Sequence, residues 1–120
     1  MAKILVAEDD KLLSASLCDA LKAQGHEPLP AYDGEIAVAK AKEWQPELIL
    51  LDIMMPTLNG WETCKILRED KQTQNIPIVI MSALPSMGDS EKAFEAGAND
   101  FIKKPFGMDE LMLKIRKWLN

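Results

Sequence analysis

The sequence predicts an α/β protein with one open parallel sheet and helices on both faces. Apolar, strand-like segments alternate with helical patterns along all 120 residues. Two of these segments, Leu48–Leu51 and Ile78–Met81, have no polar face, which is typical of strands buried in a parallel sheet. A closed eight-stranded barrel needs about twice this length, so the sheet is expected to be open.

Length and composition predict a single domain spanning residues 1–120. Hydrophobic residues make up 48% and charged residues 28% of the chain, which disfavours disorder and coiled coil. The net charge of −5 argues against direct nucleic-acid binding, which needs a basic face. No apolar run approaches the roughly 20 residues of a membrane span, and the N-terminus does not resemble a signal peptide. We therefore expect a cytoplasmic protein with no membrane or nucleic-acid partner.

The first half of the chain predicts two strands, each followed by a helix. Apolar residues at 4–7 predict the first strand, and leucines at helical spacing through 13–21 predict a helix capped by Gly25. The segment 27–29 is short and flanked by prolines, which favours a strand at the edge of the sheet. A second helix extends through 37–44, where alanines and a tryptophan form one face.

The second half predicts three more strand–helix pairs, which the two buried strands introduce. Proline- and glycine-containing loops separate the elements. In order, the sequence predicts a strand at 48–51, a helix at 61–69, a strand at 78–81, a helix from 86 to 97, a strand at 101–102 and a helix through 111–119.

Polar side chains follow the apolar strands at their carboxyl ends. They are Glu8, Asp9 and Asp10, then Asp52, then Ser82, and finally Lys103 and Lys104. Ligands of open α/β sheets bind outside the carboxyl ends of the strands, so we expect these residues to lie close together. Grouped carboxylates repel one another, and Mg²⁺ is a common compensating cation that prefers oxygen ligands. With a lysine and a hydroxyl nearby, the group is suited to holding a phosphoryl group on a carboxylate.

These motifs resemble the receiver domain of two-component response regulators over essentially the whole chain. The matching segments are ILVAEDD at 4–10, LLDIMMP at 50–56 with Gly60, IMSA at 80–83, GANDF at 97–101 and KKPF at 103–106. The resemblance, which extends to single-domain chemotaxis-type response regulators, implies a flavodoxin-like, doubly wound sheet. Its five parallel strands would have the order 2-1-3-4-5, with five helices on both faces.

The resemblance also implies a phosphoacceptor and a metal site. Asp52 would accept the phosphoryl group. Glu8, Asp9, Asp52 and the backbone carbonyl of Met54 would bind Mg²⁺, with Asp9 the more direct ligand of the acidic pair. Asp10 matches an adjacent and less critical acidic position.

Three further residues would contact the phosphoryl group or respond to it. Ser82 and Lys104 would contact its oxygens, and the peptide bond between Lys104 and Pro105 would be cis. Phe101 would rotate inward as Ser82 moves, which would change the surface formed by the fourth helix, the fifth strand and the fifth helix. Ser82 and Phe101 are therefore the expected switch residues.

The function implied is a phosphorylation-dependent signalling switch rather than a conventional enzyme. The donor would be a sensor histidine kinase or a histidine phosphotransfer protein, and an output protein would bind the surface of the fourth helix, fifth strand and fifth helix. The protein would be a monomer or a phosphorylation-dependent dimer. Met54 and Leu84, two residues after Asp52 and Ser82, offer no amide or carboxylate to orient water, which predicts slow self-dephosphorylation.

Several alternatives remain open. The chain could be a pseudo-receiver that only docks a partner, or the receiver fragment of a larger DNA-binding regulator. A metal-dependent phosphohydrolase with the same nucleophile is disfavoured, because Met54 occupies the position of its second acid. A flavodoxin-like electron carrier is disfavoured because three acids after the first strand would repel a flavin phosphate.

Overall fold

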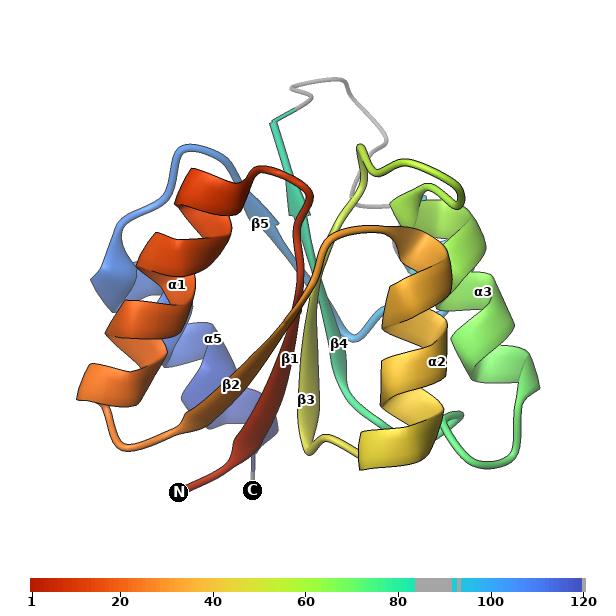
Figure 1. Ribbon diagram of the computed structural model, residues 1–120, viewed down its shortest axis with the longest axis horizontal. Helices are drawn as coiled ribbons and strands as arrows, with labels where there is room; N and C mark the ends of the chain where they lie inside the picture. Colours follow the sequence, from red (N-terminus) through yellow and green to blue (C-terminus); the bar gives the residue numbers. More distant parts are fainter. Residues whose placement is uncertain (84–91, 93, 120) are drawn as a thin grey trace.

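Strands and helices alternate along the part of the chain that a computed structural model describes, residues 1–83, 92 and 94–119. The elements are β1 (Lys3–Ala7), α1 (Lys11–Ala23), β2 (Glu27–Ala31), α2 (Gly34–Trp44), β3 (Leu48–Asp52), α3 (Gly60–Glu69), β4 (Ile78–Ser82), β5 (Asp100–Lys103) and α5 (Met108–Trp118) (Figure 1). The helix expected from 86 to 97 lies largely outside these residues, although Lys92, Phe94 and Glu95 have helical backbone.

The five strands form one parallel sheet in the order β2-β1-β3-β4-β5. Helices α1 and α5 cover one face, and α2 and α3 cover the other (Figure 1). The predicted fold class and strand order are therefore confirmed. In the sheet register, Ala7 pairs with Leu51 and Asp52 pairs with Met81, so the ends of the three central strands lie at one edge.

Two apolar clusters, one on each face of the sheet, form the core. Leu5 and Leu51 belong to the cluster beneath α2 and α3, whereas Ile4 and Leu50 belong to the cluster beneath α1 and α5. Successive residues of a strand point to opposite faces, and both faces are covered. This arrangement explains why the central strands have no polar face within their apolar segments.

Strand β2 is two residues longer than predicted and contains Pro28 and Pro30. The amide of Glu27 donates to Ala2, and the carbonyl of Ala31 accepts from Glu8. These bonds show that the odd-numbered residues of β2 face β1, so the two prolines alternate with them along the outer edge. A missing N–H there removes no bond of the sheet, which is why an edge strand tolerates proline.

The other differences from the predicted boundaries occur at element ends. Asp52 and Ser82 are the last residues of β3 and β4, because the backbone ladder continues through both polar residues. Helix α1 is capped at Gln24, and Gly25 follows it with φ +86°. Among the described residues, no helix is both long and apolar enough to cross a membrane.

Candidate functional site

Three carboxylates meet at the carboxyl edge of the sheet. Glu8, Asp9 and Asp52 each offer one oxygen, and these oxygens all lie within 4.8 Å of one another. Glu8 is 1% exposed and Asp52 is 4% exposed, whereas Asp9 is exposed to solvent. We call these three residues the acidic cluster. The structure thus brings together the side chains that the sequence predicted to bind metal.

Lys104 is the cation that contacts the acidic cluster. Its Nζ lies 2.5 Å from Glu8 Oε1 and 3.3 Å from Asp52 Oδ1. The backbone amide of Lys104 donates to the carbonyl of Ser82 at 2.7 Å, and the peptide bond to Pro105 is cis, as expected. Lys104 therefore contacts two buried acids, one directly after β1 and the other at the end of β3.

The acidic cluster has three carboxyl groups, and Lys104 supplies one ammonium group in contact with it. Burial raises the pKa of Glu8, and the charge of Asp52 raises it further, against the opposing hydrogen bond from Lys104. Burial and the neighbouring Glu8 carboxyl also raise the pKa of Asp9. Burial alone would lower the pKa of Lys104, but the two acids outweigh it and the pKa is raised. Three carboxylates facing one ammonium favour a further cation, so the acidic cluster could bind a metal ion.

The loop after β3 forms one wall of the site. The Met54 side chain is 62% exposed, and together with Met55 it borders a cavity of about 480 Å³ that reaches Asp9. Glycine is required where this loop enters α3, because a Cβ on Gly60 would lie only 2.5 Å from the carbonyl oxygen of Asp52. The metal-binding role of the Met54 carbonyl stays a prediction.

Ser82 and Phe101 lie on the neighbouring strands β4 and β5. Ser82 is buried at the end of β4. Phe101 of β5 pairs with Ile80 of β4, which lies two residues before Ser82. The Phe101 ring is half-buried and packs against the core cluster beneath α2 and α3. The switch roles of Ser82 and Phe101 stay predictions. Leu84, which together with Met54 predicted slow self-dephosphorylation, lies outside the described residues.

Asp10 has a structural role that the family resemblance did not indicate. Its Oδ1 accepts hydrogen bonds from the amides of Leu12 and Leu13, so it is the N-cap of α1. Its own amide donates to Glu8 Oε2 at 3.2 Å. An aspartate directly before a helical apolar pattern is the usual signal for such a cap. Asp10 therefore caps α1 through its side chain and orients the Glu8 carboxylate through its backbone amide.

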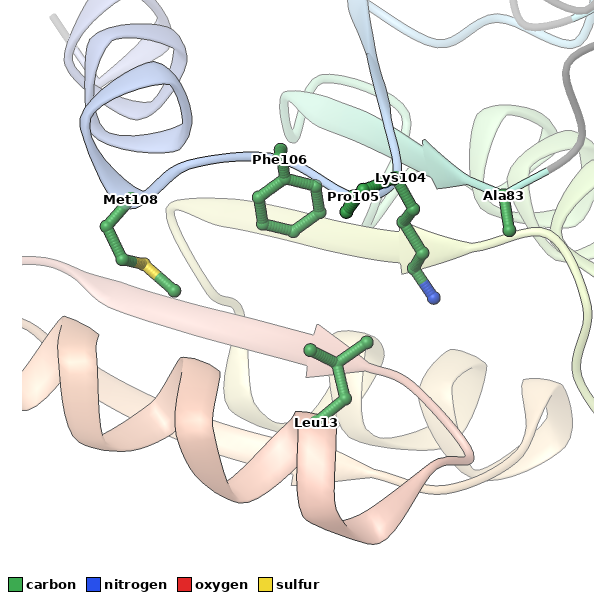
Figure 2. A pocket seen from close by; sticks show the side chains of 6 residues that line it. All are labelled: Leu13, Ala83, Lys104, Pro105, Phe106 and Met108. Carbon is green, nitrogen blue, oxygen red and sulfur yellow. The ribbon is translucent and has the colours of Figure 1, made fainter.

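A second cavity, of about 470 Å³, opens beside Lys104. Figure 2 shows Lys104 extending from the loop after β5 towards the ends of β1 and β3. The cavity is mostly apolar, and nothing in the local spacing predicted it, because its walls come from distant segments. Its lining residues are Leu13, Ala83, Lys104, Pro105, Phe106 and Met108.

Comparisons with known proteins agree on one family. Residues 4–116 match the response regulator receiver domain. The DNA-binding dual master transcriptional regulator RpaA of Synechocystis is 35% identical over 120 residues, which cover 100% of this chain and 50% of that protein. The curated relatives that the chain matches are longer, and it spans between 25% and 51% of their length.

Two solved structures are similar over nearly their whole length. The receiver domain of the Pseudomonas aeruginosa sensor histidine kinase PA1611, solved with a magnesium ion in its active site cleft, is 29% identical with a TM-score of 0.91, over 98% of this chain and 97% of that chain. The Vibrio cholerae chemotaxis protein CheY4 is 28% identical with a TM-score of 0.93, over 99% of each chain.

Proposed function

The chain belongs to the response regulator receiver family, and we propose that it is a phosphorylation-dependent signalling switch whose acceptor is Asp52. The observation that best supports this function is the acidic cluster with Lys104 in contact with it. Asp52 is the last residue of β3, the central strand of the sheet, and its Oδ1 lies 3.3 Å from Lys104 Nζ. A sensor histidine kinase or a histidine phosphotransfer protein would supply the phosphoryl group.

In the proposed transfer, an oxygen of Asp52 forms a bond to phosphorus while the bond from phosphorus to the donor imidazole breaks. The imidazole nitrogen leaves with the electron pair of that bond, and Asp52 becomes an acyl phosphate. Lys104 would bind a phosphoryl oxygen, and its Nζ lies 3.3 Å from Asp52 Oδ1, which supports this role. Ser82 at the end of β4 would donate to another oxygen. These residues mainly position and stabilise charge, which is what phosphoryl transfer requires.

The donor set of the acidic cluster fits Mg²⁺. All three ligand atoms are carboxylate oxygens, and their mutual repulsion favours a hard divalent cation. Glu8, Asp9 and Asp52, with the backbone carbonyl of Met54, would hold it. When bound, Mg²⁺ would neutralise charge on the phosphoryl oxygens. Magnesium in the active site cleft of the PA1611 receiver domain is consistent with this assignment.

Output would follow from protein binding rather than from catalytic turnover. The surface formed by the predicted fourth helix, β5 and α5 would bind the output partner. The protein would act as a monomer or as a phosphorylation-dependent dimer. Met54 is the residue two positions after Asp52, and its thioether cannot orient a water molecule for hydrolysis. Slow self-dephosphorylation would therefore keep the signal until a partner removes it.

Two protein contexts are compatible with the comparisons. The chain covers half of a regulator described as DNA-binding and 99% of a chemotaxis protein. In the first context the receiver would control a DNA-binding output domain, and in the second it would act through a separate protein. The proposed chemistry at Asp52 is the same in both.

Intact mass spectrometry after incubation with acetyl phosphate and Mg²⁺ tests the proposal. The expected result is one added phosphoryl group on the wild-type protein and none on Asp52→Asn or without Mg²⁺. Asp33→Asn is the matched control, because Asp33 caps α2 through its side chain and asparagine caps helices equally well. It should be phosphorylated like the wild type.

The same experiment distinguishes the alternative. If wild-type protein gains no phosphoryl group and beryllofluoride with Mg²⁺ also leaves its amide spectrum unchanged, the chain is a pseudo-receiver. Phosphorylation that persists in Asp52→Asn would assign the acceptor to another residue.

A further inference from the structure

Phe101 and α5 lie on opposite faces of the sheet. The Phe101 ring packs beneath α2 and α3, whereas the next residue, Ile102, belongs to the cluster beneath α1 and α5. Figure 1 shows α5 on the same side of the sheet as α1. Because Phe101 and α5 lie on opposite faces of the sheet, the backbone of β5 offers a direct connection from this ring to α5.

Asp100 connects this backbone to α5. Its Oδ1 accepts from the Phe101 amide at 2.8 Å and from Lys114 Nζ at 2.9 Å. Its Oδ2 accepts from Trp118 Nε1 at 2.8 Å. Lys114 and Trp118 are four residues apart on α5 and so lie on one side of that helix. We call Asp100, Phe101, Lys114 and Trp118 the Asp100 network.

The contacts of this network involve a charged and largely buried carboxylate. The Lys114 and Asp100 side chains are 28% and 13% exposed. Burial alone would raise the pKa of Asp100, but the hydrogen bonds from Trp118, Lys114 and the Phe101 amide outweigh burial and lower it. Hydrogen bonds to a carboxylate are short and strong, so a shift of the Phe101 amide would change the bonds that the same carboxylate makes to α5.

We propose that the Asp100 network transmits the phosphorylation state of Asp52 from Phe101 to the C-terminal end of α5. This inference rests on the proposed function, because it assumes that Phe101 moves when the acceptor is occupied. Asp100 is a positioning residue and takes no part in the chemistry. An occupied site would shift the Phe101 amide, reorient the Asp100 carboxylate and alter the hydrogen bond of the Trp118 indole.

The indole N–H resonances of the three tryptophans can report this directly in ¹⁵N-labelled protein. Beryllofluoride with Mg²⁺ serves as the phosphoryl mimic, and the ¹⁹F signal of the bound mimic measures occupancy. The expected result is a shift of the Trp118 indole on binding, with no shift of Trp44 in α2. In Asp100→Asn the mimic should still bind, but the Trp118 response should be lost.

Two further variants complete the test. Asp109→Asn changes an exposed acid in the first turn of α5 and should keep the full Trp118 response. If Asp100→Asn does not fold, Lys114→Gln removes the charged partner of the carboxylate and should reduce the response while leaving Trp118 as the reporter.

Each outcome has one meaning. A bound mimic with an unmoved Trp118 indole in the wild type, or a full response in Asp100→Asn or Lys114→Gln, overturns the network and leaves the proposed function intact. Absence of a bound mimic overturns the proposed function, and the inference fails with it.

Discussion

At the carboxyl end of the sheet, three carboxylates face one lysine, whereas at the amino end one guanidinium faces a group of oxygen acceptors. Arg68 of α3 donates from Nε to Gly97 O at 2.6 Å, from Nη1 to Ile76 O at 2.8 Å, and from Nη2 to Asn99 Oδ1 at 2.7 Å. Asn99 Oδ1 also accepts from the Ile78 amide. We call these residues the Arg68 network: Arg68, Ile76, Ile78, Gly97 and Asn99.

The two ends differ in how completely their polar groups are compensated. The Arg68 network matches donors with acceptors and joins α3 to the starts of β4 and β5. The acidic cluster holds like charges together, and the pKa of Glu8 is raised by burial and by its neighbour. Polar groups at the amino end are therefore largely paired with one another, whereas the carboxyl end keeps clustered carboxylates that favour binding of a cation.

The largest expected effect is at Arg68. Arg68→Ala removes the guanidinium donors of the partly buried Gly97 and Ile76 carbonyls, so the free energy of unfolding should fall by about 2–4 kcal/mol. Urea denaturation measures this, with Arg116→Ala on the exposed side of α5 as the control, which should change stability by less than about 0.5 kcal/mol. A loss below about 1 kcal/mol in Arg68→Ala would show that the network is dispensable.

Two glycines allow the effect of contact with Arg68 to be distinguished from the effect of backbone strain. Gly25 and Gly97 have φ of +86° and +101°, but a Cβ would meet nothing within 4 Å at Gly25 and would lie 2.5 Å from Arg68 Cγ at Gly97. Gly25→Ala should cost about 1–2 kcal/mol for its left-handed backbone. Gly97→Ala should lower the free energy of unfolding by more than Gly25→Ala, because its Cβ would also collide with Arg68. Equal losses of stability in thermal unfolding would show that this collision contributes nothing.

At the opposite end, a substitution in the acidic cluster should stabilise the metal-free protein. Asp52→Asn removes one of three clustered charges, and we expect the free energy of unfolding to rise by about 1 kcal/mol without Mg²⁺. Added Mg²⁺ should stabilise the wild type more than the variant, because the proposed site is the native acidic cluster and includes Asp52. A destabilised Asp52→Asn in EDTA would mean that its contact with Lys104 outweighs the repulsion.

The pH dependence of Asp100 should have the sign of a stabilising carboxylate. Its lowered pKa means that the native state favours the charged form, so its contribution is complete above the unfolded pKa of about 4 and is lost as pH falls through the folded value. Asp100→Asn should therefore be less stable than the wild type at pH 7, with a gap that narrows in acid. A gap that is constant with pH would contradict this.

The smallest effect concerns the lifetime of the phosphorylated state. Met54→Asn places an amide two residues after Asp52, where it can orient a water molecule, so phosphate loss should be a few-fold faster. Met108→Asn is the control, since this methionine lines the other cavity beside Lys104. An unchanged half-life in Met54→Asn would show that water access is controlled elsewhere.

Much of the fold and of the acidic cluster was predictable, because apolar periodicity, turn residues and the polar residues after the strands all pointed to the same arrangement. The apolar segments of β3 and β4 predicted buried parallel strands, and Asp52 directly after one of them predicted a polar edge. The boundaries were less predictable, because a strand ends where its ladder ends rather than where polarity begins. Ser82, at the end of β4, illustrates this.

The sequence by itself determined the order of strands and helices, the buried character of the central strands and the residues that end them, because apolar period and turn residues are local properties. Only the tertiary structure decided that Lys104 contacts Glu8 and Asp52, that Arg68 binds the segment before β5, and that Asp100 joins β5 to α5. These contacts join residues that are distant in sequence or lie on different elements. Their geometry depends on how the helices pack against the sheet, which residue spacing does not specify.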